Sequence, residues 1–180
     1  MPAEVEKVGY APDAIANEFL SLPAAKGKLS PMKIQKLVYY AHGWHLALAD
    51  SPLVYENVEA WKYGPVFPSL YATFRDYGSG PITELAVELS SRRGEDGQLK
   101  FKRYNPRVNE GDERVKGLIQ RIWDKVGHYS PTQLSSLTHQ PGTPWHTVIS
   151  QFQDWIPQGV AIPNELIQDY FRDQLKKTSK

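Results

Sequence analysis

The sequence predicts a mainly α-helical fold: a single compact helical domain of about six helices with one small β-hairpin. Three observations support this fold class. Apolar residues recur at three- and four-residue spacing over most of the chain, which is the periodicity of one helix face. Apolar and polar residues alternate, as they do in a strand, in one region only, between residues 85 and 102. The length of 180 residues fits one domain better than two.

Two helices are predicted in the N-terminal part of the chain. Apolar residues between positions 15 and 20 predict a short helix that ends at Pro23. The pair Ser30-Pro31 predicts a second helix start, because serine caps free backbone amides and proline suits the first turn. An apolar face continues from there to about Asp50. His45 falls within this face, so we expect it to be a hydrogen-bonded core residue.

A turn and a short helix are predicted next. The residues Tyr-Gly-Pro at positions 63–65, followed by Pro68, would break any long helix, so we expect a turn there. Apolar and aromatic residues from 70 to 77 then predict a short helix that ends at Gly78.

The one β signal lies in the middle of the chain. Apolar residues alternate with others on both sides of a polar connection, residues 92–97, that ends in Asp-Gly, and this is typical of a β-hairpin. The alternating residues are Leu85, Val87, Leu89, Leu99 and Phe101. We therefore expect a hairpin insertion at about residues 84–104. Because an isolated hairpin is only marginally stable, we expect it to pack against the helices.

Helical periodicity returns in the C-terminal half. An apolar face from residue 115 to residue 126 predicts a helix that ends at Gly127. Ser130-Pro131 and Thr143-Pro144 repeat the capped helix start. We expect a connector over residues 151–161, a last helix around residues 166–175, and a frayed tail at residues 176–180.

Composition and charge exclude several classes of protein. Lysine and arginine number 21 against 20 for aspartate and glutamate, so the net charge of +1 lacks the basic excess of a phosphate-binding protein. The cysteine count of 0 excludes disulfides, thiolate nucleophiles and cysteine-based zinc sites. Residues 1–10 do not resemble a signal peptide, and no apolar run approaches the ~20 residues of a membrane helix. We expect a soluble, cytoplasmic protein that does not enter a membrane.

The sequence contains no recognisable catalytic motif. It lacks Gly-x-Ser-x-Gly, a P-loop, Gly-x-Gly-x-x-Gly and His-Glu-x-x-His. Ser136 and His139 are close in sequence, but that proximity alone does not make a catalytic triad. His42 and His45 lack a carboxylate at a metal-site spacing. We therefore expect no enzyme activity, no catalytic residue, no metal and no cofactor.

Three stretches together resemble a known family. The first is KIQKLVYYAHGWHLAL at residues 33–48. The second is VEAWKYGPVFP at residues 58–68, which is the most specific of the three. The third is residues 134–139 followed by Pro144-Trp145. In order and spacing they resemble the SocA-like Panacea antitoxin domain. The resemblance covers about residues 10–175, which implies a single Panacea-like domain over residues 1–180.

The resemblance implies a function by protein binding. Proteins of this family are antitoxins of bacterial and phage toxin–antitoxin pairs, and each neutralises a toxin by direct contact. It therefore implies a cognate toxin as partner, encoded in an adjacent gene and acting as an inhibitor of translation or growth. Because the family includes a proteolytic adaptor, it also implies a ClpXP-type protease as a second candidate partner. The identity of the toxin does not follow from the resemblance.

The block at residues 58–68 and the predicted hairpin supply candidates for the partner-binding site, because aromatic side chains are favoured anchors at interfaces. The candidates are Trp61, Lys62, Tyr63, Pro65, Val66, Tyr71, Lys100 and Lys102. The residues expected to preserve the scaffold instead are Gly64, Trp44, His139, Pro144 and Trp145. Two alternatives stay open. Trp61 and Tyr63 could fill the core, and the basic residues of the hairpin could form a solvated face that blocks edge-to-edge pairing.

A DNA-binding regulator is an alternative function. The predicted helix to Val126, the turn at Gly127 and the helix from Pro131 have the spacing of a helix-turn-helix. However, residues 131–139 contain no arginine or lysine to anchor phosphates. Nucleic acid is therefore not the partner that we expect.

Overall fold

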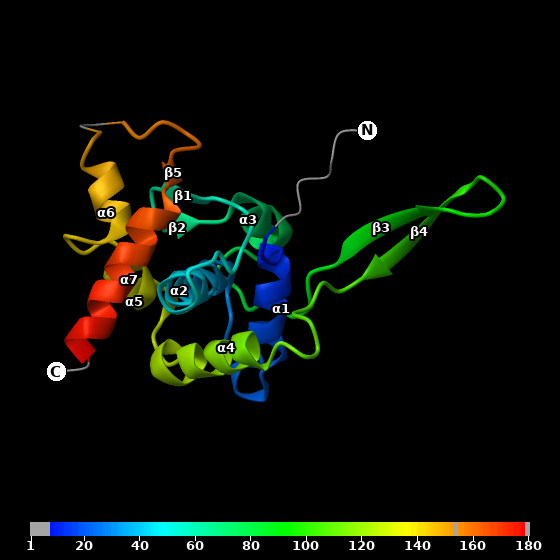
Figure 1. Cartoon of the computed structure of the whole chain (residues 1–180), viewed down its shortest axis with the longest axis horizontal. Coiled ribbons are helices and arrows are strands. Elements are labelled where there is room, and N and C mark those ends of the chain that lie inside the picture. The colour runs from blue at the N-terminus through cyan, green and yellow to red at the C-terminus, as the bar shows by residue number, and fades with distance from the viewer. Residues whose placement is uncertain (1–7, 153–154, 179–180) are drawn as a thin grey trace.

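The body of the protein is organised around one long helix. The computed structural model describes residues 8–152 and 155–178. Helix α2 (Pro31–Ala49) lies in the middle and packs against α1 (Pro12–Ser21), α4 (Glu113–Val126), α5 (Pro131–Thr138) and α7 (Asn164–Thr178) (Figure 1). Because helices surround it, α2 buries almost its entire circumference, including the fully buried Ile34, Leu37 and Val38.

The predicted helix starts are confirmed. The Ser30 hydroxyl accepts a hydrogen bond from the backbone amide of Lys33, and Ser130 forms a capping box with Gln133 at the start of α5. Thr143 caps α6 (Pro144–Ile149) in the same way. Four shorter or peripheral elements complete the helical part: the 3₁₀ turns at Pro23–Ala25 and Arg75–Tyr77, α3 (Pro68–Phe74), and α6 itself.

The predicted mainly α-helical fold class is wrong. Among the described residues, the structure has seven α-helices and five strands in two antiparallel sheets, which is a mixed α/β fold. The sheet that was missed has the order β2-β1-β5, formed by Gly64–Val66, Val58–Trp61 and Ala161–Ile162. These strands are too short to display alternation, and β5 begins at Ala161, the last residue of the region that was expected to be a connector.

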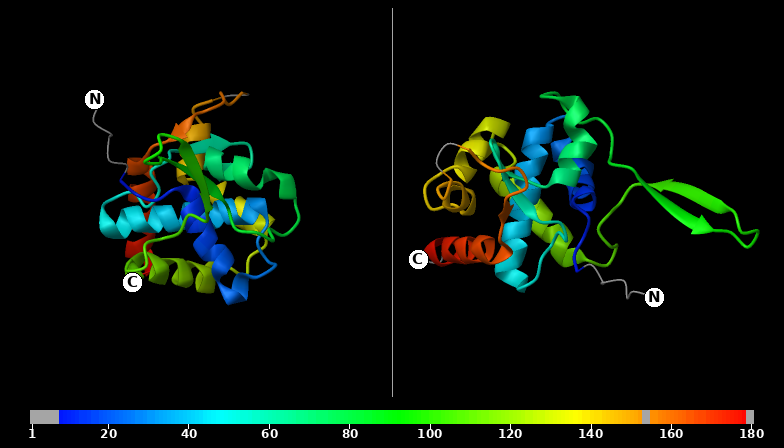
Figure 2. Two further views of the ribbon diagram at one scale, coloured as in Figure 1. Left: turned by 90° about the vertical axis from the view of Figure 1, so that its right-hand side faces the viewer. Right: turned by 90° about the horizontal axis from the view of Figure 1, so that it is seen from above.

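The predicted β-hairpin exists, but its expected packing is wrong. Strands β3 (Glu88–Arg93) and β4 (Leu99–Tyr104) pair antiparallel and project away from the helical body instead of resting on it (Figure 1; Figure 2, right). Leu85 and Val87 precede the first strand. Every residue of β4 is exposed, and so is every residue of β3 after Glu88. We call this hairpin, residues 88–104, the arm.

The two ends of the chain are described only in part. Residues 176–178 continue α7, whereas residues 179–180 of the predicted frayed tail and residues 1–7 lie outside the described residues. Within the part of the chain that is described, none of the helices has the length and apolar character needed to cross a membrane.

Candidate partner-binding site

The block at residues 58–68 forms a tight hairpin in the body. Trp61 pairs with Gly64, so Lys62 and Tyr63 form the two-residue turn between β1 and β2. Gly64 has a φ of +107°. A Cβ atom there would lie 2.6 Å from the Lys36 Nζ atom and 2.7 Å from the Thr138 Oγ1 atom. Glycine is therefore required at this position for both its backbone conformation and its close packing.

Side chains from α5 and α6 bind the carbonyl oxygens of three consecutive residues of this hairpin. The Trp145 indole donates a 2.7 Å hydrogen bond to the Trp61 carbonyl. The His139 Nε2 atom lies 3.2 Å from the Lys62 carbonyl oxygen. The Ser135 hydroxyl donates a 3.1 Å hydrogen bond to the Tyr63 carbonyl. The turn is thereby fixed to the helices before any partner arrives.

His139 and Trp145 also support each other. Their ring centroids are 3.9 Å apart, and Pro144 places Trp145 in the first turn of α6. The His139 Nδ1 atom lies 2.6 Å from the Ser135 carbonyl oxygen. Because a neutral imidazole carries one N–H group, it donates either to Ser135 or to Lys62, whereas the protonated ring donates to both.

Helix α2 holds the hairpin from the inside. The buried Lys36 ammonium donates a 3.1 Å hydrogen bond to the Pro65 carbonyl, and burial lowers the pKa of Lys36 to about 7. The Gln35 side-chain amide donates to the Phe67 carbonyl at 3.1 Å and accepts from the Phe67 amide at 3.0 Å. These contacts leave little freedom for β2 to shift along α2.

The outer side of the hairpin presents aromatic rings to solvent. Tyr63 is 60% exposed and Tyr71 is 42% exposed, and the Tyr71 ring meets the half-buried Trp61 edge-to-face at 5.0 Å. The Lys62 Nζ atom lies 5.5 Å from the centroid of the Tyr63 ring. We call Trp61, Tyr63 and Tyr71 the aromatic patch. It borders a hollow of about 450 Å³ that Met32 and Arg75 also line.

The structure brings only some of the candidate residues together. Trp61, Lys62, Tyr63 and Tyr71 share the surface around the aromatic patch. Pro65 and Val66 are buried, and Val66 lines the hollow beside the aromatic patch. Lys100 and Lys102 lie on the arm, which extends away from the body (Figure 1). Trp44 is half-buried against Phe171 and lines a separate hollow between α2, α4 and α7.

Comparison with known proteins identifies the family. The family described as "Antitoxin SocA-like, Panacea domain" matches residues 34–146, which is more than half of the chain. The chain belongs to this family. The resemblance predicted from the sequence is thus confirmed. This Panacea protein is also 33% identical over 162 residues to "Antitoxin SocA" of Caulobacter vibrioides (strain NA1000 / CB15N), covering 89% of this chain and 82% of that relative. No solved structure matches it.

Three residues that bind the backbone of the hairpin at residues 58–68 were not among the candidates predicted from the sequence. Gln35, Lys36 and Ser135 all bind the backbone of residues 63–67, although none of them was a candidate. A signal for two of them exists, because Lys33, Gln35 and Lys36 are polar residues at the start of an otherwise apolar helix, and all three are buried. Burial of such residues indicates that each has a specific partner.

The histidines of α2 have structural partners. His45, which was expected to be a hydrogen-bonded core residue, is half-buried, and its Nδ1 atom lies 2.8 Å from the Ser51 carbonyl oxygen. His42 is the fully buried one. Its Nε2 atom lies 2.9 Å from the Asn164 Oδ1 atom, and its Nδ1 atom accepts from the Val54 amide at 3.2 Å. Burial lowers the pKa of His42 to about 4, which favours the neutral ring that this bonding pattern needs. Within the described ranges, no three His, Asp or Glu side chains form a potential metal site.

Helix α5 is tied into the body of the Panacea domain. Leu134 and Thr138 are buried, and Ser135 is bonded to the turn at Tyr63. A recognition helix would instead project its side chains into a DNA groove. The packing of α5 therefore does not favour the helix-turn-helix interpretation.

Proposed function

We propose that this protein is an antitoxin that neutralises a cognate toxin by direct protein–protein binding and without catalysis. Membership of the SocA-like Panacea family supports the antitoxin role. The observation that carries the binding mode is the fixed hairpin at Trp61–Gly64, whose turn carbonyls are held by α5 and α6 while Tyr63 points to solvent. Aromatic side chains on a pre-organised scaffold bind with little loss of conformational entropy.

The toxin is a growth or translation inhibitor encoded in the neighbouring gene. The test is co-expression of this chain with the product of each adjacent reading frame in a bacterial growth assay. We expect one neighbour to arrest growth alone and to lose that effect when this chain is present. If no neighbour is toxic, or if toxicity persists in the presence of this chain, the antitoxin function is wrong.

Tyr63→Ala tests the aromatic patch as the toxin-binding surface. Because Tyr63 is exposed and its carbonyl bond to Ser135 involves only the backbone, the change should leave the fold intact. We expect the dissociation constant for the toxin to rise about tenfold, as for an interface anchor. Calorimetry measures the affinity, and a thermal melt confirms that the variant is folded.

Leu48→Ala is the matched control, because Leu48 is a large apolar side chain that is exposed to solvent to about the same extent as Tyr63. Leu48 is exposed near the end of α2, whereas Met32 and Lys36 lie at its start, and a helix rises about 1.5 Å per residue. Affinity should be unchanged. If Leu48→Ala weakens binding and Tyr63→Ala does not, the interface lies at the hollow between α2, α4 and α7 instead.

Direct neutralisation also predicts the fate of the toxin in the cell. A bound toxin should have an unchanged or longer half-life when this chain is co-expressed. A half-life that falls, and that recovers when the ClpXP protease is deleted, would replace simple sequestration by delivery to a protease.

A further inference from the structure

The arm carries an apolar face that nothing in the described part of the chain covers. In the β3–β4 register, Leu89 pairs with Arg103, Ser91 with Phe101, and Arg93 with Leu99. Directly paired residues of antiparallel strands point to the same side. One side therefore holds Leu89, Leu99 and Phe101, flanked by two arginines. Their exposures are 68%, 56% and 67%. Monomeric proteins seldom leave three neighbouring large apolar side chains so open to water.

Polar contacts order the arm without covering this face. At its base, the Tyr104 hydroxyl donates a 2.6 Å hydrogen bond to the Glu88 carboxylate. At its tip, the Arg93 guanidinium donates to the Gly97 carbonyl at 3.0 Å, and the Gly94 amide donates to the Gln98 carbonyl at 2.8 Å. The arm is thus an ordered hairpin, and its apolar side chains are exposed to solvent.

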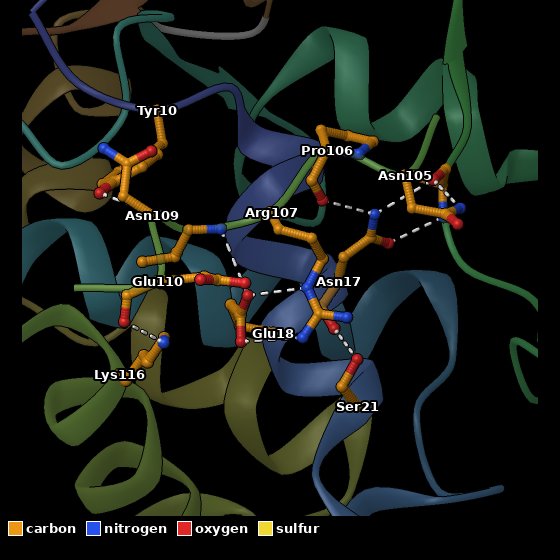
Figure 3. Close-up of polar contacts among 12 residues, drawn as sticks. Tyr10, Asn17, Glu18, Ser21, Asn105, Pro106, Arg107, Asn109, Glu110 and Lys116 are labelled. Carbon is orange, nitrogen blue, oxygen red and sulfur yellow. Dashed lines mark hydrogen bonds and ion pairs between the residues drawn. The ribbon is translucent and has the colours of Figure 1, made fainter. Parts of the chain in front are cut away.

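The chain segments directly before and after the arm are both hydrogen-bonded to α1. The buried Asn17 side chain accepts from the Ala86 amide at 2.8 Å and donates to the Ala86 and Pro106 carbonyls at 3.1 and 2.9 Å (Figure 3). The Glu18 carboxylate accepts from the Arg107 guanidinium at 2.8 and 3.2 Å. Since the chain is fixed where it leaves the body and where it returns, the arm has a set direction.

The charge of the arm indicates what kind of partner would cover its apolar face. Strands β3 and β4 carry five cations, Arg92, Arg93, Lys100, Lys102 and Arg103, and one anion, Glu88. The turn between them adds two anions, so the arm has five cations against three anions and a net charge of +2. The whole chain has a net charge of only +1, so the basic charge is concentrated here. A second copy would oppose cations to cations, which disfavours pairing of two arms. A nucleic acid would neutralise the cations but leave Leu89 and Leu99 exposed to water.

We infer that the arm is a second contact element of this antitoxin, and that its apolar face packs against an acidic protein surface on the toxin. This inference rests on the proposed function. The arm and the aromatic patch lie on different parts of the molecule (Figure 1). Together they would contact the toxin at two separate places. Two linked contacts raise the affinity beyond either alone.

The test uses the toxin identified by co-expression and the full-length chain. Phe101→Ala should raise the dissociation constant about tenfold, because it removes the central side chain of the apolar face. Ser90→Ala, on the opposite face of the same strand pair, is the matched control and should have no effect. Arg103→Glu should weaken binding more at low salt than at high salt, because the new negative charge repels an acidic partner. Thermal melts of all variants should match the wild type.

The outcomes separate this inference from the proposed function. If the wild-type chain does not neutralise any neighbour, the proposed function fails. If the wild type neutralises the toxin and the Phe101→Ala and Arg103→Glu variants bind it as tightly, the arm inference is wrong while the function stands. It is equally wrong if light scattering finds a dimer that Phe101→Ala dissociates, or if a labelled duplex of the upstream DNA binds and only that binding is lost.

Discussion

The two sheets of this protein differ in how they are supported. The body sheet, β2-β1-β5, has strands of three, four and two residues, yet its turn is bonded to α2, α5 and α6. The arm has two six-residue strands in an unbroken register, yet it is exposed on both faces. The sheet with the stronger local pattern is therefore the one with less tertiary support. We associate the first with stability and with the fixed turn that carries the aromatic patch, and the second with binding alone.

Substitution of two glycines with positive φ angles, one in each sheet region, is the strongest test of this comparison. Gly64→Ala in the body should destabilise the protein by about 3 kcal/mol, because it adds backbone strain to a clash with Lys36 and Thr138. Gly97 at the arm tip has a φ of +75° and no atom within 4 Å of an added Cβ. Gly97→Ala should lower the free energy of unfolding by about 1 kcal/mol or less, since the arm opens locally.

Urea denaturation followed by tryptophan fluorescence measures what each of the two substitutions does to the stability of the body. All 5 tryptophans lie outside the arm, so their emission reports on the body alone. Equal losses in the two variants would mean that the arm and the body unfold as one cooperative unit, and the proposed division between them would be wrong.

Acid should weaken the body through His42. Its pKa is lowered from 6.5 to about 4 by burial, so the native state favours the neutral ring. The stabilisation is complete above pH 6.5 and is lost as the pH falls through the window from 6.5 to about 4, where the unfolded chain binds the proton first. The loss that His42 alone contributes is about 3 kcal/mol, and Asp13 offsets part of it because its pKa is raised. His42 bridges Val54, close to β1, and Asn164, close to β5, so the loss falls on the body sheet.

The measurement is a series of urea denaturations between pH 7 and pH 4, compared with the same series for His42→Asn. The variant should be less stable at neutral pH, since its shorter side chain cannot replace both bonds, but it should lose less stability on acidification. A wild-type slope that persists unchanged in the variant would assign the acid sensitivity to another group.

The comparison of the two sheets also explains which parts of the fold the sequence could predict. Periodicity located α2 and α4, because apolar residues recur at three- and four-residue spacing over several turns of each. The pairing of Val58 with Ile162 joins segments about a hundred residues apart, so no local pattern indicates it. The alternation around Leu89 and Phe101 correctly predicted a hairpin. It could not reveal that the apolar face has no helix against it, because alternation says which side is apolar and not what covers it.

The candidate site divides in the same way. The Tyr-Gly-Pro turn was predictable from the conformational preferences of glycine and proline. Ser135 is not unusual in its own segment, and its role depends on the backbone group that the folded chain brings to it. Gln35 stands out as a polar residue in a mostly apolar helix, but the sequence does not show that it binds the backbone of Phe67. Tertiary contacts, rather than residue type, decide which polar side chains hold the site.

The replacement of Asp13 should give the smallest effect. Asp13 sits at the start of α1, and its carboxylate accepts a 2.9 Å hydrogen bond from the Thr73 hydroxyl. Burial raises its pKa to about 6, and the negative charges of Glu88 at the arm base and of Glu56 act in the same direction. Because the native state favours the protonated form, this contribution is present below pH 3.8 and is lost as the pH rises through about 6.

Asp13→Asn removes the unfavourable charge at neutral pH. We expect it to stabilise the protein by about 1 kcal/mol at pH 7, less than the pKa shift alone would give, because the new amide buries a donor where the Asp13 Oδ1 atom has no partner among the described residues. At pH 3.5 the gain should vanish. Between these values Asp13 and His42 act in opposite directions, so the wild type should show a shallow pH dependence and the Asp13→Asn variant a steep one. If the stability of the Asp13→Asn variant depends on pH as weakly as that of the wild type, Asp13 does not contribute to the pH dependence.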